Sequence, residues 1–195
     1  RTPLNAIVGF SMILSMIDFD TAEAEEHKKL ILLNNRMLMM LIDDIIELSG
    51  VDANAVTFAK DPVNVKEMFE ELIEIGYSNL YQKELSIVSE IGEKTPIVYT
   101  DEKYLQRLFV NLLSNAIKFT EERTISLGYR KQKNGYYFYV KDTGCGIPEE
   151  DQERIFRRFQ KLDSYRQGTG LGLALCKSII THLGGEIGVD SEVGK

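Results

Sequence analysis

The sequence contains little cysteine, no tryptophan and no long apolar segment. Its 195 residues include only two cysteines, Cys145 and Cys176, too few for a disulfide framework, which indicates a reducing compartment. The longest wholly apolar run, residues 37–42, is far shorter than the about 20 residues that a membrane-spanning helix needs. No signal peptide opens the chain. These absences favour a non-secreted protein, and a composition of 44% hydrophobic and 27% charged residues predicts that the chain folds.

Basic charge and histidine are also scarce. The chain has 23 Lys and Arg residues against 30 Asp and Glu residues, so its formal net charge is −7 and we expect no nucleic-acid contact. The excess acid is concentrated early, because residues 1–62 contain 5 bases and 10 acids, whereas residues 63–195 contain 18 and 20. The only two histidines, His27 and His182, lie in contexts that predict structural positions on helices.

The first 49 residues have the pattern of two helices. Apolar residues recur at helical spacing through residues 4–17 and again through 30–48. Thr21 precedes a run rich in glutamate, which predicts the N-cap of the second helix. The apolar stripe of that helix is too broad for one partner helix. We therefore predict a hairpin that dimerises through residues 1–49 into a four-helix bundle.

Beyond residue 50, strand-like and helical segments alternate. Strands are predicted at 55–58, 85–88, 97–99, 124–129, 136–141 and 186–190, and helices at 65–81, 101–120 and 171–183. A Lys133-Asn-Gly135 turn predicts that two of these strands form a hairpin. The fold class is therefore α+β: a helical hairpin over residues 1–62, followed by an α/β sandwich over residues 63–195.

A polar face on the helix at 101–120 is the first candidate site. Asn111, Asn115 and Lys118 are spaced four and three residues apart, so they share one side of the helix. Two amide oxygens and one ammonium group suit a divalent cation that bridges phosphates. The alternative is an ordinary solvated helix face.

Two glycine-rich segments follow. Residues 142–148, DTGCGIP, come directly after a strand, where Asp142 can accept a hydrogen bond from an exocyclic amine, although a plain turn is the alternative. Residues 168–173, GTGLGL, open a helix, so their backbone N–H groups can bind a phosphate. The glycine spacing differs from the dinucleotide-binding fingerprint.

The segment between the glycines is basic. Residues 154–166 contain five bases and one acid within an acidic chain. A long basic loop between glycines is typical of a lid that covers phosphates, and we interpret Phe156 and Phe159 as anchors of that lid. A surface helix with ordinary charges is the alternative.

Together these clusters resemble, in order and spacing, the ATP-binding domain of sensor histidine kinases, within the GHKL superfamily that includes gyrase B. Residues 111–120 are similar to the N box, 142–148 to the first glycine box, 155–159 to the F box and 168–173 to the second glycine box. The opening RTPL, residues 1–4, resembles the second half of the H box. The resemblance therefore covers the whole chain and implies a GHKL (Bergerat) ATP-binding sandwich after the hairpin.

The resemblance implies a role for each matching residue. Asn115, helped by Asn111, would hold Mg²⁺ against the phosphates of ATP, and Lys118 would contact a phosphate. Asp142 would accept a hydrogen bond from the adenine amino group. The other residues implied to shape the nucleotide site are Gly144, Gly146, Ile147, Arg158, Gly168, Thr169, Gly170, Leu171, Gly172 and Leu173. Thr2 falls where the family places a residue that orients water for dephosphorylation of the partner.

The implied reaction transfers the γ-phosphoryl group of ATP to a histidine of the dimerisation domain, and then to an aspartate of a response-regulator receiver. The acceptor histidine would fall just before Arg1, and the last strand of the sandwich is also expected to be cut. We therefore expect a fragment that cannot phosphorylate itself. It would be the cytoplasmic kinase core of a membrane-anchored sensor.

Two other functions stay open from the sequence. One is a GHKL kinase that phosphorylates serine, or a gyrase-type ATPase, although those relatives lack the RTPL hairpin. The other is a binding module, a nucleotide-gated dimer that acts only as a phosphatase or scaffold for its regulator. The residues encoded just before Arg1 discriminate among these, because the autokinase requires a histidine there.

Overall fold

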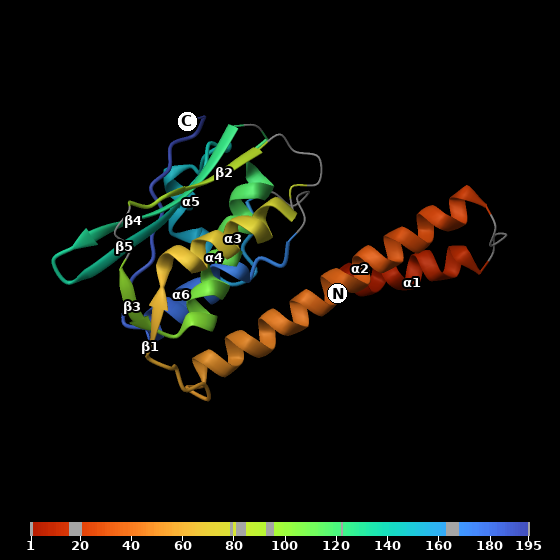
Figure 1. Cartoon of the computed structure of the whole chain (residues 1–195). Coiled ribbons are helices and arrows are strands. Elements are labelled where there is room, and N and C mark those ends of the chain that lie inside the picture. Colours follow the sequence, from red (N-terminus) through yellow and green to blue (C-terminus); the bar gives the residue numbers. More distant parts are fainter. Residues whose placement is uncertain are drawn as a thin grey trace.

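A helical hairpin extends from an α/β body (Figure 1). The computed structural model describes residues 2–15, 21–78, 80, 85–92, 96–121, 123–162 and 168–194. The helices are α1 Thr2–Leu14, α2 Ala22–Asp52, α3 Val65–Ser78, α4 Glu102–Phe119, α5 Glu149–Gln152 and α6 Gly172–His182, with a 3₁₀ helix η1 at Arg154–Phe156. The strands are β1 Asp61–Asn64, β2 Leu85–Glu90, β3 Ile97–Thr100, β4 Arg123–Gln132 and β5 Gly135–Lys141.

The hairpin consists of α1 packed along the half of α2 that lies away from the body (Figure 1). Thr21 caps α2 as predicted, because its Oγ1 accepts a 3.1 Å hydrogen bond from the backbone N of Ala24. The predicted interruption before Thr21 falls largely on residues 16–20, outside the described residues. Many large apolar side chains on both helices are exposed: Leu4, Val8, Met12, Ile13, Leu32, Leu33, Met39, Met40, Ile42, Ile45 and Ile46.

The body is a sandwich of a mixed sheet and helices. Its main sheet has the order β2-β4-β5, with β2 and β4 parallel and β4 and β5 antiparallel, and β1 pairs with β3 in a second, two-stranded sheet. The predicted hairpin is confirmed, because Gln132 pairs with Gly135 and leaves a two-residue turn. Helices α3 and α4 cover the main sheet through a core that includes Met68, Phe69, Leu72, Ile87, Phe109, Leu113, Ile125 and Leu127.

The strand predicted at 55–58 is wrong. This segment is not part of a sheet, and the first strand is β1, which begins three residues later. Val56 and Phe58 pack instead against a buried cluster that includes Tyr104, with the rings of Phe58 and Tyr104 4.7 Å apart. In residues 55–58, the alternating apolar pattern therefore corresponds to alternating burial without strand pairing.

The closing strand predicted at 186–190 is also not found. Ile187 and Val189 are half-buried and their neighbours are exposed, so the burial pattern alternates as in a strand. The segment forms no ladder with the described strands. The residue that follows this segment contacts the first glycine segment through its side chain: Ser191 Oγ accepts a 3.0 Å hydrogen bond from the backbone N of Ile147.

A second buried cluster joins the hairpin to the body. Leu48 and Val51 from the last turns of α2 pack against Leu171, Leu175 and Ile179 at the start and along the length of α6. Helix α6 also packs on α4, so the end of the hairpin lies against the helices of the body. Among the described residues, no helix is long and apolar enough to cross a membrane.

Candidate nucleotide-binding site

The polar face of α4 lies at the centre of the candidate site. Asn111, Asn115 and Lys118 are half-buried, whereas Leu113 and Ala116 on the other side of the helix are buried in the core. Asn111 Nδ2 donates a 3.2 Å hydrogen bond to the backbone oxygen of Arg107 one turn earlier. Because the amide nitrogen makes this hydrogen bond, Asn111 Oδ1 is the atom of the side chain that can accept a hydrogen bond or coordinate a cation.

The first glycine segment folds tightly after β5. Asp142 Oδ1 accepts a 2.8 Å hydrogen bond from the backbone N of Gly144, which fixes the carboxylate at the end of the strand. A Cβ on Gly144 would lie 2.8 Å from the carbonyl oxygen of Phe119, so this loop presses on the last residue of α4. Gly146 has φ +73°, and a Cβ there would overlap the backbone of Glu192.

The second glycine segment leads into α6. Gly170 has φ +72°, and a Cβ there would lie 3.0 Å from the carbonyl carbon of Phe159, which brings the turn against the end of the preceding segment. Thr169 Oγ1 accepts a 3.2 Å hydrogen bond from the backbone N of Leu171. Leu171 is fully buried and Leu173 is half-buried, so these two residues anchor the turn in the body.

Two close approaches bring the second glycine segment onto the polar face of α4. Lys118 Nζ lies 3.0 Å from the position that a Cβ on Gly168 would occupy. Asn111 Oδ1 lies 2.9 Å from the corresponding position at Gly172. An amide oxygen, an ammonium group and a glycine-rich turn at a helix N-terminus therefore share one site, as phosphate and cation binding require.

Known proteins identify this arrangement. Residues 100–195 match the family described as histidine kinase-, DNA gyrase B-, and HSP90-like ATPase. The whole chain aligns at 34% identity with the circadian input-output histidine kinase CikA of Synechococcus elongatus, covering 27% of that protein. It aligns, also over its whole length and at 34% identity, with the aerobic respiration control sensor protein ArcB of Escherichia coli, covering 26% of it.

The chain carries the catalytic ATPase domain of a sensor histidine kinase. Full-length ShkA, solved in complex with AMPPNP, has a TM-score of 0.80 and 28% identity over the whole chain, which covers 41% of ShkA. The Acinetobacter baumannii histidine kinase AdeS has a TM-score of 0.84 at 23% identity, with 91% of that chain covered, and shows the fold. The α+β class and the GHKL-type ATPase fold are thereby confirmed. The chain spans between 10% and 27% of the curated relatives CikA, GacS and hybrid kinase B.

The basic segment of this kinase domain is only partly as predicted. Phe156 is half-buried, and Lys177 Nζ lies 6.0 Å from the centre of its ring, whereas Phe159 is 64% exposed with φ +59° and is not an anchor. The guanidinium of Arg158 binds the carboxylate of Asp52 on α2. The other part of the proposed lid, residues 163–167, lies outside the described residues.

Sequence reasoning missed the groups that α2 contributes to this site. Asp44 and Glu47 of α2 both bind Arg107 of α4, and Asp44 also binds Thr169 in the second glycine segment. The one sequence signal for Arg107 is its position four residues before Asn111, which places it on the same face of α4.

Three other residues lie apart from these contacts. Thr2 begins α1, and its side chain lies outside the described residues. His182 Nε2 donates a 3.0 Å hydrogen bond to Asn54 Oδ1, and the imidazole ring stacks on Phe58, which agrees with a structural position. Burial between α6 and α4 raises the pKa of the Cys176 thiol to about 12, so this thiol is uncharged near neutral pH.

Proposed function

We propose that the parent protein is a sensor kinase that phosphorylates a histidine from ATP and passes the phosphoryl group to a response-regulator receiver. The observation that carries this proposal is the approach of Asn111 to Gly172 and of Lys118 to Gly168, which brings two distant motifs together at the proposed phosphate-binding site. Asp142 is proposed to bind the adenine amino group through Oδ2, since Oδ1 is bound by Gly144.

The donor set fits Mg²⁺ bound together with ATP. The described residues contain no group of three or more His, Cys, Asp or Glu side chains that could hold a metal by themselves. Mg²⁺ in such enzymes keeps several waters and takes one or two protein oxygens plus the phosphates of the substrate. The amide oxygens of Asn115 and Asn111 would supply those protein ligands. The ion would neutralise charge on the phosphates.

The chemistry left to the protein is positioning and charge. An imidazole nitrogen of the acceptor histidine attacks the γ-phosphorus, the bond to the β,γ-bridging oxygen breaks, and ADP leaves. A receiver aspartate oxygen then attacks the same phosphorus, the P–N bond breaks, and the histidine is restored. Lys118 would offset the phosphate charge, and the backbone N–H groups of the glycine turns would cradle it.

We further propose that residues 1–62 form the dimerisation and phosphotransfer domain and residues 63–195 the catalytic domain. The exposed apolar side chains of α1 and α2 support a homodimer through residues 1–49 that closes a four-helix bundle. Thr2 is proposed to orient water when the receiver is dephosphorylated. The core would work in the cytoplasm as part of a membrane-anchored sensor and make no nucleic-acid contact of its own.

The deciding experiment is to incubate the full-length protein with ATP labelled on the γ-phosphate. The proposal expects label that is stable in base, is lost in acid, and moves to a receiver domain. Acid-stable label on serine would favour a GHKL serine kinase, and ATP hydrolysis without any label would favour a gyrase-type ATPase. ATP binding with neither outcome would favour a phosphatase or scaffold.

A further inference from the structure

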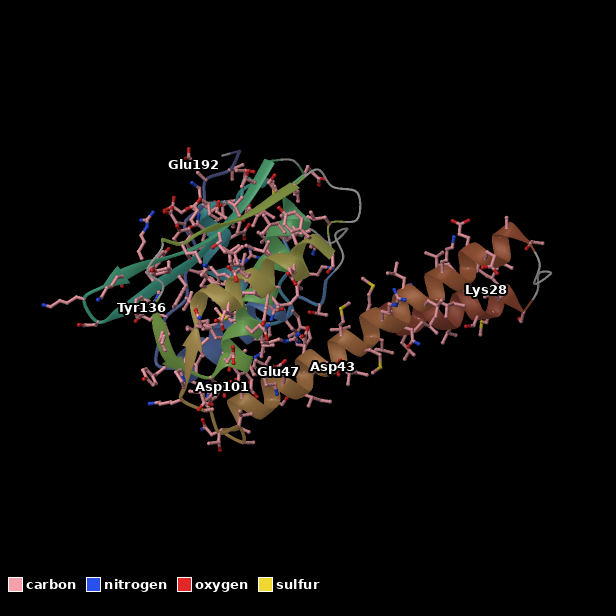
Figure 2. All side chains as sticks on the ribbon, in the orientation of Figure 1. Lys28, Asp43, Glu47, Asp101, Tyr136 and Glu192 are labelled. Atoms are coloured by element: carbon pink, nitrogen blue, oxygen red, sulfur yellow. The ribbon has the colours of Figure 1, made fainter. Side chains whose placement is uncertain are left out.

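Two carboxylates of α2 hold one arginine of the catalytic domain. Arg107 Nη2 lies 3.1 Å from Asp44 Oδ1, and Arg107 Nε lies 3.0 Å from Glu47 Oε2. Only 10% of the Asp44 side chain and 35% of the Arg107 side chain are exposed, so this ion pair is partly shielded from water and its attraction is stronger than that of a fully exposed pair. Figure 2 shows Glu47 on the part of α2 that runs beside the body.

The second oxygen of the same carboxylate reaches the glycine-rich turn. Thr169 Oγ1 donates a 2.9 Å hydrogen bond to Asp44 Oδ2. Arg107 and Thr169 therefore bind the two oxygens of one carboxylate, although they come from α4 and from the turn before α6.

This carboxylate has the surroundings of a bound anion. A guanidinium fork, a hydroxyl group and a glycine-rich turn that opens a helix are the groups that bind phosphate oxygens in proteins. The position adjoins the polar face of α4, because Arg107 lies one helical turn before Asn111 and Thr169 follows Gly168, whose Cβ position is 3.0 Å from Lys118 Nζ. An anion held there would lie beside the proposed Mg²⁺ ligands.

We propose that Arg107 and Thr169 form a binding subsite for a phosphate of ATP, and that Asp44 occupies this subsite when α2 is docked on the catalytic domain. The inference rests on the proposed binding of ATP. It adds a phosphate-binding arginine outside the four sequence motifs. It also makes the hairpin a competitor of the nucleotide.

A second carboxylate of α2 also binds an arginine that is proposed to contact the nucleotide. Arg158, which is proposed to bind the nucleotide, is paired with Asp52 of α2, and Asp52 Oδ1 also accepts a 2.8 Å hydrogen bond from Ser178 of α6. One guanidinium cannot bind Asp52 and a phosphate in the same geometry. Docking of α2 and binding of ATP therefore weaken each other, and by the same factor in both directions.

The test compares ATP affinities by calorimetry in the presence of Mg²⁺. Asp44→Asn keeps the size of the side chain but removes the competing charge, so its Kd for ATP should fall at least about fivefold, the lower end of usual coupling between sites. Asp43→Asn is the matched control, since Asp43 is an exposed acid one position earlier on α2 and should leave the Kd unchanged. Adding Arg107→Gln to Asp44→Asn should abolish the gain.

Each other result overturns the inference. An equal Kd for the wild type and Asp44→Asn would exclude competition, and a raised Kd would make Asp44 a support of the turn. Absence of ATP binding in every variant would instead refute the proposed function, and this inference with it. Hydrogen exchange needs no variant: a non-hydrolysable ATP analogue should accelerate exchange of the amides at residues 44–52 in the wild type, and unchanged exchange contradicts the proposal.

Discussion

Asn111 Oδ1 on α4 lies 2.9 Å from the position of a Cβ on Gly172 at the start of α6. Gly172→Ala should therefore push the amide aside and weaken MgATP binding by about tenfold to a hundredfold, as small misplacements in a site can. Folding stability should not fall, because alanine is a better helix former than glycine by about 1 kcal/mol. Calorimetry and thermal unfolding separate the two effects.

Gly188→Ala is the matched control for this prediction. Apart from the two chain neighbours, none of the residues that the structure describes has a heavy atom within 4 Å of a Cβ at Gly188, so both the ATP affinity and the unfolding temperature should stay at wild-type values. Unchanged ATP affinity in Gly172→Ala would show that Asn111 does not act at the nucleotide.

The parts of the site that could be predicted from the sequence depend on local pattern. Asn111, Asn115 and Lys118 share a face because of the helical repeat, and the turns at Gly146 and Gly170 adopt positive φ values that favour glycine. Such features depend on residues within one helix or one turn. The sequence alone is therefore enough to predict them.

The contacts that escaped prediction depend on tertiary packing. Asp44 and Thr169 are 125 positions apart, and nothing in either local sequence indicates that they meet. Phe159 has the residue type of a core position, but its backbone adopts φ +59° and its side chain is exposed. Residue type and period predict which segments are helices, whereas the docking of helices has to be observed.

Asn115→Ala and Asp142→Ala should each lose ATP binding by about tenfold to a hundredfold, the usual cost of removing a hydrogen bond to a charged group. Their effects should differ in kind. Asn115→Ala should reduce the dependence of binding on Mg²⁺, and Asp142→Ala should reduce the preference for ATP over GTP. Calorimetry with each nucleotide, with and without Mg²⁺, measures both.

Ser114→Ala and Lys141→Ala serve as controls for those two variants. Both residues are exposed and lie next to Asn115 and Asp142 in sequence, so their removal should change neither affinity nor stability. Wild-type affinity in Asn115→Ala or Asp142→Ala would place the nucleotide elsewhere.

The two cysteines should react at very different rates with an alkylating reagent. Cys145 is exposed between two glycines of the first glycine segment, whereas burial raises the pKa of Cys176 to about 12. Because the thiolate is the reactive form and its fraction grows as pH rises toward the pKa, Cys176 should stay unmodified at pH 8. Mass spectrometry of the native protein should find one modified thiol, and MgATP should slow its modification.

Cys145→Ser tests the assignment of that thiol. This variant should show no rapid modification in the native state. Its remaining thiol, Cys176, should become reactive only when the protein unfolds. Rapid labelling of Cys176 in the folded protein would contradict its burial, and the absence of any MgATP protection at Cys145 would count against the proposed position of the nucleotide.

Dimerisation should depend on the exposed apolar surface of the hairpin. Met40 and Ile46 on α2 are 52% and 65% exposed, so Met40→Glu or Ile46→Glu should disturb an interface and leave the core of the body intact. A charge buried between helices is costly, and each variant should shift the protein toward monomer by tenfold or more in dissociation constant, about 1.4 kcal/mol. Light scattering at micromolar concentration measures the shift.

Tyr99→Glu is the control, because Tyr99 is 72% exposed on β3, outside the hairpin. A wild-type protein that is monomeric under these conditions would exclude the four-helix bundle.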